Sequence, residues 1–170
     1  MFAILSAGLA AAVVLASKAP PPLECRLTAP ASAPAGGPLL VRFTLRNRSS
    51  QPLSVLTWQT PLEGLLGDVF RVIPQGGEAL PYLGPMVKRK APEGDEYVRL
   101  APGGEASEEV DLAAAYELTP GRYSVAFVGR ILDVASPAEA PRPPGRQRPV
   151  SVSCRPLEIE IHSRPEGQSR

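Results

Sequence analysis

An alternation of apolar side chains with mostly polar ones over residues 39–47 is the feature that most constrains the fold. Successive side chains of a β-strand point to opposite faces, so the pattern predicts a strand with one buried face and one solvated face. Residues 122–127 repeat the alternation directly after the turn residues Thr119-Pro120-Gly121. The apolar sets are Leu39, Val41, Phe43 and Leu45 in the first segment and Tyr123, Val125 and Phe127 in the second.

Turn-forming residues divide the rest of the chain into short segments. The 170 residues include 21 Pro and 15 Gly, which favours an all-β fold with many turns, and 44% hydrophobic residues can bury the core of one domain. The inward-facing set changes parity near the end of the chain, so we expect a bulge or kink at Arg155-Pro156. We predict further strands at residues 23–28, 53–59, 69–74, 79–82, 97–100, 106–112, 150–154 and 157–161.

Residues 1–19 have the pattern of a secretory signal peptide. The segment is apolar, rich in small residues, and offers Ala16 or Ala19 before a cleavage site. It lacks a basic residue before the apolar run, and Pro20 follows Ala19, so an uncleaved membrane anchor is the alternative. The run is shorter than the roughly 20 residues that a spanning helix needs. We therefore expect a secreted or periplasmic protein that has no membrane contact after cleavage.

Cys25 and Cys154 are the two cysteines, and each lies on the apolar side of a predicted strand. Export makes a disulfide chemically reasonable, and the first and last strands of a β-sandwich are often neighbours. We therefore predict a Cys25–Cys154 disulfide. Two buried free thiols are the alternative. A lipid anchor on Cys25 is a third option, which the residues Pro22-Leu23-Glu24 disfavour because they are not small.

A long series of aromatic, turn and charged residues follows the first alternating strand. It opens at Trp58, the single tryptophan, and continues through the turn at residues 60–64. The other members of the series are Asp68-Val69-Phe70, Tyr82-Leu83-Gly84-Pro85, Val87-Lys88-Arg89, Pro92, Asp95-Glu96-Tyr97, Leu100-Ala101-Pro102-Gly103, Asp111-Leu112, Tyr116 and Gly121-Arg122-Tyr123.

This series resembles the non-catalytic N-terminal pro-domain of the deuterolysin-type, lysine-specific zinc metalloendopeptidases over about residues 23–161. The resemblance implies an immunoglobulin-like antiparallel β-sandwich of about seven to nine strands. We assign it to residues 20–163, with a polar tail at 164–170. The zinc motif His-Glu-x-x-His is missing, and the single histidine, His162, has neither partner. Since the sequence ends at Arg170, where the protease domain of the family would begin, we expect a domain without the catalytic part.

Six aromatic residues are predicted to build or brace the core. Trp58 is a candidate for the buried core tryptophan of immunoglobulin-like domains. Tyr123, just after a turn, is a candidate for a tyrosine corner, in which the hydroxyl ties the turn to the backbone; a plain core tyrosine is the alternative. The remaining predicted core aromatics are Phe70, Tyr82, Tyr97 and Phe127.

The sequence offers no catalytic constellation. One histidine and two distant cysteines do not make a metal site, and no nucleophile has a visible base. The acidic run at residues 93–96 could donate oxygens to Ca²⁺, but its spacing favours a solvated turn. A net charge of +1 gives no support to nucleic-acid binding. We expect a protein that is not an enzyme and has no cofactor and no bound metal.

Two basic segments are candidates for partner binding. The run Lys88-Arg89-Lys90 could enter the cleft of a protease, because the resembled enzymes cut at lysine; a solvated surface loop is the alternative that short charge runs favour. The Pro- and Arg-rich residues 136–149 form either a binding loop or a flexible insertion, and composition favours the insertion. The candidate residues in this loop are Arg142, Arg146 and Arg148.

We therefore predict an exported, monomeric, non-catalytic module. Its expected partner is a protein, with a zinc metalloprotease as the candidate that the module binds, inhibits or helps to fold in trans. The alternative is a general adhesion or assembly module of the cell envelope, because this fold carries many unrelated binding functions.

Overall fold

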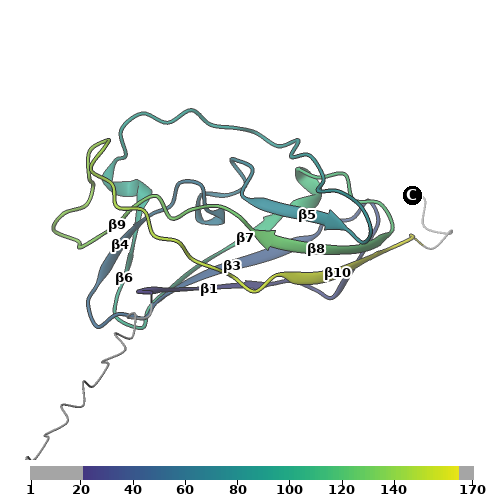
Figure 1. Cartoon of the computed structure of the whole chain (residues 1–170), viewed down its shortest axis with the longest axis horizontal. Coiled ribbons are helices and arrows are strands. Elements are labelled where there is room, and N and C mark those ends of the chain that lie inside the picture. Colours follow the sequence, from purple (N-terminus) through teal and green to yellow (C-terminus); the bar gives the residue numbers. More distant parts are fainter. Residues whose placement is uncertain (1–20, 165–170) are drawn as a thin grey trace, which may run out of the picture.

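The computed structural model describes residues 21–164, which fold as a β-sandwich (Figure 1). The predicted signal at residues 1–19 and the tail beyond residue 164 lie outside this range. Among the described residues, no helix is long and apolar enough to cross a membrane. The elements are β1 (Leu23–Thr28), β2 (Ser32–Pro34), β3 (Leu40–Asn47), β4 (Leu53–Leu56), η1 (Pro61–Glu63), β5 (Phe70–Pro74), η2 (Gly94–Glu96), β6 (Tyr97–Leu100), β7 (Glu105–Asp111), η3 (Leu112–Ala114), β8 (Gly121–Phe127), β9 (Val134–Ala135) and β10 (Leu157–His162).

Three sheets organise these strands. The first has the order β1-β3-β7, with β3 antiparallel to both neighbours. The second has the order β2-β10-β8-β5, in which only the short β2 runs parallel to its partner. The third, β6-β4-β9, lies at one end of the sandwich. The described part of the chain has ten strands, which include β2 and β9, of three and two residues, in segments for which no strand was predicted.

The core lies between the first two sheets, where their inward faces meet. The alternating set of β3 is 0–1% exposed, as its period-two pattern predicts. Phe43 of β3 packs on Phe127 of β8 with ring centroids 4.9 Å apart, and Phe70 of β5 meets Phe127 at 6.3 Å. Burying each large apolar side chain contributes about 1.5–3 kcal/mol. This aromatic contact therefore joins both sheets through the centre of the domain.

A disulfide also joins the two sheets. Cys25 of β1 is bonded to Cys154, which lies just before β10, and the Cα atoms are 4.8 Å apart. This confirms the predicted pairing. The predicted tyrosine corner is also confirmed. The Tyr123 hydroxyl donates to the Thr119 carbonyl at 2.8 Å and accepts from the Thr119 N–H at 3.0 Å. The turn that leads into β8 is thus tied to the strand itself.

Two predicted strands do not form. Residues 150–154 are extended but make only one isolated bridge, Ile131 with Val150, because prolines on either side of the segment donate no hydrogen bond. Residues 79–82 pair with β5 through the Leu80 N–H alone, and Pro81 cannot continue the ladder. The predicted change of parity is confirmed: Arg155 and Pro156 are both exposed between the buried positions on either side.

Candidate functional site

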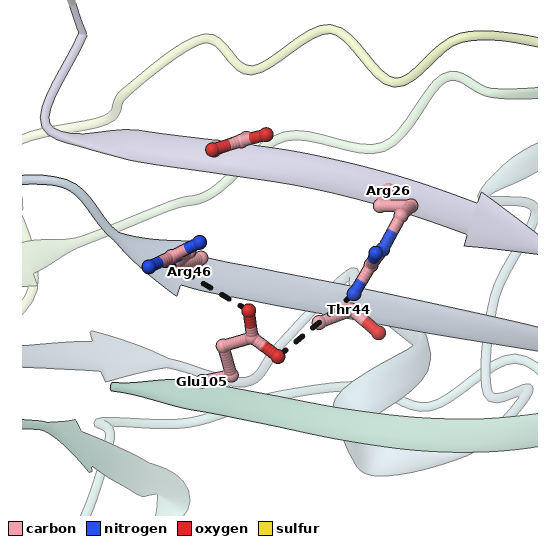
Figure 2. A pocket seen from close by; sticks show the side chains of 5 residues that line it. Arg26, Thr44, Arg46 and Glu105 are labelled. Atoms are coloured by element: carbon pink, nitrogen blue, oxygen red, sulfur yellow. Dashed lines mark ion pairs between the residues drawn. The ribbon is translucent and has the colours of Figure 1, made fainter. Parts of the chain in front are cut away.

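The outer face of the first sheet carries a small, charged hollow of about 50 Å³ (Figure 2). Glu105 of β7 lies between Arg26 and Arg46, 3.9 and 3.8 Å from their nitrogens. The Thr44 and Ser107 hydroxyls are 2.8 Å apart beside it. Exposed pairs of this kind contribute about 0–1 kcal/mol each. This face is therefore a solvated surface in which both arginines already lie against a carboxylate.

A second hollow, of about 870 Å³, lies along the outer edge of β1. The residues 21–25 form one side, and the extended residues 151–153 form the other. Within the described part of the chain, residues 151–153 make no backbone hydrogen bond. Two extended backbones thus face an open gap that the Cys25–Cys154 disulfide limits at one end. We call this the β1 groove.

A third hollow, of about 440 Å³, is the strongest candidate for a binding site. Five large hydrophobic residues are exposed in the described chain, and three of them line this hollow: Met86 is 79% exposed, Val87 45% and Val128 43%. Clustered apolar exposure marks interaction surfaces, whereas single exposed apolar residues are ordinary. We call it the Trp58 hollow, lined by Trp58, Gln59, Glu63, Leu66, Gly67, Asp68, Val69, Met86, Val87, Arg89, Val128, Gly129, Arg130 and Leu132.

Trp58 is buried, as predicted, but it lines this hollow and is not part of the central core cluster. It is 6% exposed, yet it is covered by the Arg89 guanidinium, whose central carbon is 5.2 Å from the ring centroid. Its indole N–H donates to Glu96 Oε1 at 2.8 Å. β4 ends at Leu56, before the tryptophan, because the chain turns there. The indole therefore lies against Arg89 and Glu96, outside the central core cluster.

The turn after Trp58 is held by side chains. Gln59 has φ +54°, a left-handed conformation that is uncommon outside glycine, and its N–H donates to Glu63 Oε1 at 3.0 Å. The Thr60 hydroxyl accepts from the Leu62 N–H at 3.2 Å and so caps η1, whose first residue is Pro61. The sequence Thr-Pro-Leu-Glu-Gly therefore fixes both the turn and the carboxylate that receives Arg89.

Arg89 bridges two carboxylates, whereas its neighbours do not. It forms ion pairs with Glu63 and with Glu96, the latter at 3.8 Å, and its side chain is only 27% exposed. Lys88 and Lys90 are exposed and form no ion pair with any described residue. Of the predicted basic run, the structure thus turns the middle residue inward and leaves the two lysines in solvent.

The Pro- and Arg-rich loop is fixed to the sandwich, in contrast to the predicted flexible insertion. Arg142 is 7% exposed and donates to Asp133 at 2.8 Å, to the Val134 carbonyl at 2.9 Å and to Glu139 at 2.8 Å. Arg142 is therefore a buried structural residue and cannot present its charge to a partner. Hydrogen bonds from Ser136 and Arg142 lower the pKa of Glu139.

Asp133 organises this loop, and the sequence reading missed it. The carboxylate is 0% exposed and accepts from Arg142, from the Arg148 N–H at 2.7 Å and from the Tyr97 hydroxyl at 2.8 Å. Burial, and next the bond to Asp133, raise the pKa of Tyr97 to about 12. Tyr97 thus belongs to a polar network and not to the apolar core. An acidic residue at an inward position between Ile131 and Ala135 was the available signal.

Arg146 and Arg148 are exposed, and only the backbone of Arg148 is part of this network. No residue of the 136–149 loop lines the Trp58 hollow, so the two predicted binding segments do not form one site.

The remaining predicted core aromatics differ in burial. Phe70, Tyr123 and Phe127 are buried in the core, whereas Tyr82 is half-buried and packs against it.

A family model of the immunoglobulin-like domain matches residues 22–137, more than half of the chain. The chain belongs to this family. The matched region of this immunoglobulin-like domain includes the whole Trp58 hollow, but it ends before Cys154 and β10.

The immunoglobulin-like domain is also similar to a protein described as an extracellular protease from Aeromonas hydrophila. The two are 27% identical over 89 residues. That stretch covers 52% of this chain and 25% of the protease, so the chain spans about a quarter of the relative it matches.

Proposed function

We propose that this immunoglobulin-like domain is an exported, non-catalytic module that binds an extracellular protease through the Trp58 hollow. The observation that carries the proposal is the grouping of Met86, Val87 and Val128 as exposed apolar residues around one hollow. Similarity to part of an extracellular protease supports this partner class, as does the resemblance to a metalloprotease pro-domain.

The chemistry of the hollow suits contact with another protein. Met86 is unbranched and can adapt to a partner surface, whereas the β-branched side chains of Val87 and Val128 have few rotamers. Arg89 and Arg130 form a polar rim. An apolar centre with a polar rim is the arrangement that concentrates binding energy in protein interfaces. Among the described residues, no group of three or more His, Cys, Asp or Glu is placed to hold a metal.

A matched pair of variants tests this function. The probe is the Aeromonas hydrophila extracellular protease prepared without the quarter that matches this chain. We expect the oxidised domain to bind it, and Val128→Asp to weaken binding about tenfold or more by placing a charge in the apolar centre. Leu40→Asp is the control, because Leu40 is 41% exposed on the first sheet and lies outside the hollow.

Both variants must first show the thermal stability of the parent protein. Retained binding in Leu40→Asp with loss in Val128→Asp supports the Trp58 hollow as the interface. Equal effects of the two substitutions, or no binding of the parent domain, would contradict the proposal.

The second candidate function is the adhesion or assembly module of the cell envelope, and the β1 groove favours it. Two extended backbones with free hydrogen-bonding groups can receive a strand from another protein. A peptide that binds the domain equally well in the Val128→Asp variant, but loses binding in Val152→Pro, would favour this candidate.

A further inference from the structure

Lysine is rare in this protein, and its placement is uneven. Three of the 18 basic residues are lysines, namely Lys18, Lys88 and Lys90. Lys18 lies outside the described residues. The two lysines of the described chain, Lys88 and Lys90, lie in the same loop and line one further hollow on another side of Trp58. An enzyme that recognises lysine side chains therefore meets the described part of the chain in one loop, whereas arginines occur throughout the sandwich.

The loop itself has the features of a proteolytic substrate. Residues 84–93 cross the molecule from the end near β5 to the end near β6 (Figure 1). Within the described chain, the backbone groups of residues 86–92 make no hydrogen bond. Endopeptidases bind extended backbone, and a segment outside any ladder can enter a cleft without unfolding a strand.

The loop is also held at both ends. The Tyr82 hydroxyl lies 2.8 Å from the Pro85 carbonyl oxygen and 2.9 Å from that of Leu65, and burial raises the pKa of this hydroxyl. Toward the other end, Pro92 is buried, and Arg89, between the two lysines, is fixed over Trp58. A segment whose ends are fixed loses less entropy when an enzyme binds it.

We propose that Lys88 and Lys90 make this loop a lysine-directed cleavage site, at which an endopeptidase cuts the folded domain without releasing either half. Arg89 is excluded as the recognised residue, because its guanidinium would first have to leave Glu63, Glu96 and the Trp58 ring. The inference goes beyond the proposed binding function, since the cutting enzyme and the bound partner can be different proteins.

The reaction is ordinary amide hydrolysis. The oxygen of one water bonds to the carbonyl carbon of Lys88 or Lys90, and the C–N bond to the next residue breaks. Both protons of the water finish on the released nitrogen, which becomes an ammonium, and the lysine gains a carboxylate. Because the cut lies between Cys25 and Cys154 in the sequence, the disulfide keeps the two halves covalently joined.

A cut changes the Trp58 hollow. After hydrolysis at Lys88, Met86 and Val87 stay attached at Tyr82 but lose their connection to the fixed Arg89. One apolar wall of the hollow is then a free chain end. Cleavage would therefore turn a fixed apolar surface into a mobile one, while Arg89 stays over the Trp58 ring.

The test compares a lysine-specific with an arginine-specific endopeptidase on the folded, oxidised protein. We expect the lysine-specific enzyme to give one full-length band without reductant and two fragments with it, with the cut mapped by mass spectrometry to residue 88 or 90. In the variant Lys88→Arg, the guanidinium at position 88 forms no ion pair, whereas that of Arg89 is held by Glu63, Glu96 and the Trp58 ring. We expect the arginine-specific enzyme to cut this variant about tenfold more slowly after Arg89 than after position 88.

Two results would overturn the proposal. One is that the folded protein resists the lysine-specific enzyme during the time in which the reduced, unfolded protein is fully cut. The other is that the bond after Arg89 is cut as fast as the bond after position 88 in Lys88→Arg. Neither result bears on protease binding at the hollow, so the two proposals are tested separately.

Discussion

Replacing Asp133 by Asn should destabilise the domain strongly. Asp133 is 0% exposed and its partner Arg142 is 7% exposed, so the substitution leaves a buried guanidinium with only the half-exposed Glu139 carboxylate as countercharge. Removing one partner of a buried ion pair costs about 3–5 kcal/mol. The one oxygen of asparagine can still accept from Arg142 and from the Arg148 N–H, but its N–H₂ group then faces the Tyr97 hydroxyl, which loses the carboxylate to which it donates. At about 2–4 °C per kcal/mol, the melting temperature should fall by about 6–20 °C.

The assay is thermal and urea unfolding of the oxidised protein, followed by circular dichroism. Glu139→Gln is the control, because this carboxylate also pairs with Arg142 but its side chain is 49% exposed, so its loss should cost much less than the loss of Asp133. The double variant Asp133→Leu/Arg142→Met should be more stable than Asp133→Asn, since it buries no unpaired charge. An Asp133→Asn protein as stable as Glu139→Gln would refute the reasoning.

Three further predictions concern the same scaffold. The pKa of Tyr97 is raised from 10.0 to about 12, so the contribution of its protonated hydroxyl to stability is complete below pH 10 and is lost as the pH rises toward 12. In Tyr97→Phe, the free energy of unfolding should therefore decline less steeply between pH 10 and about 12. Replacing Cys25 and Cys154 by Ala should cost about 5 kcal/mol by loop entropy, measured by urea unfolding, and an unchanged midpoint would contradict the entropic account. Gly129→Ala places a methyl group against the Gln59 carbonyl oxygen and should lower the melting temperature measurably, unlike an Ala at Gly67, where space is open.

The parts of the fold that the sequence predicted depend on local patterns. The alternation at residues 39–47 and 122–127 needs only the period of a strand, and the tyrosine corner needs only a turn four residues away. The disulfide was predictable because both cysteines lie in extended, apolar-patterned segments near the chain ends.

The differences from prediction depend on individual side-chain partners. Proline and arginine in residues 136–149 indicate an exposed loop, yet a single buried carboxylate at Asp133 draws Arg142 inside. Trp58 is buried, as a core tryptophan would be, but it lies outside the central core cluster. Its position is decided instead by Arg89 and Glu96, more than 30 residues later, and no local pattern encodes that contact.

The disulfide between β1 and the segment before β10 also decides how the domain responds to mechanical load. A pulling force applied at the two termini enters at Cys25 and leaves at Cys154, so the covalent bond carries it past the sandwich. Only the chain outside the bond, the first residues of β1 and all of β10, can be peeled away. β3, β5, β7 and β8, together with the Trp58 hollow, lie inside the closed ring and bear no tension. The domain can therefore be stretched between two attachment points while the Trp58 hollow keeps its shape.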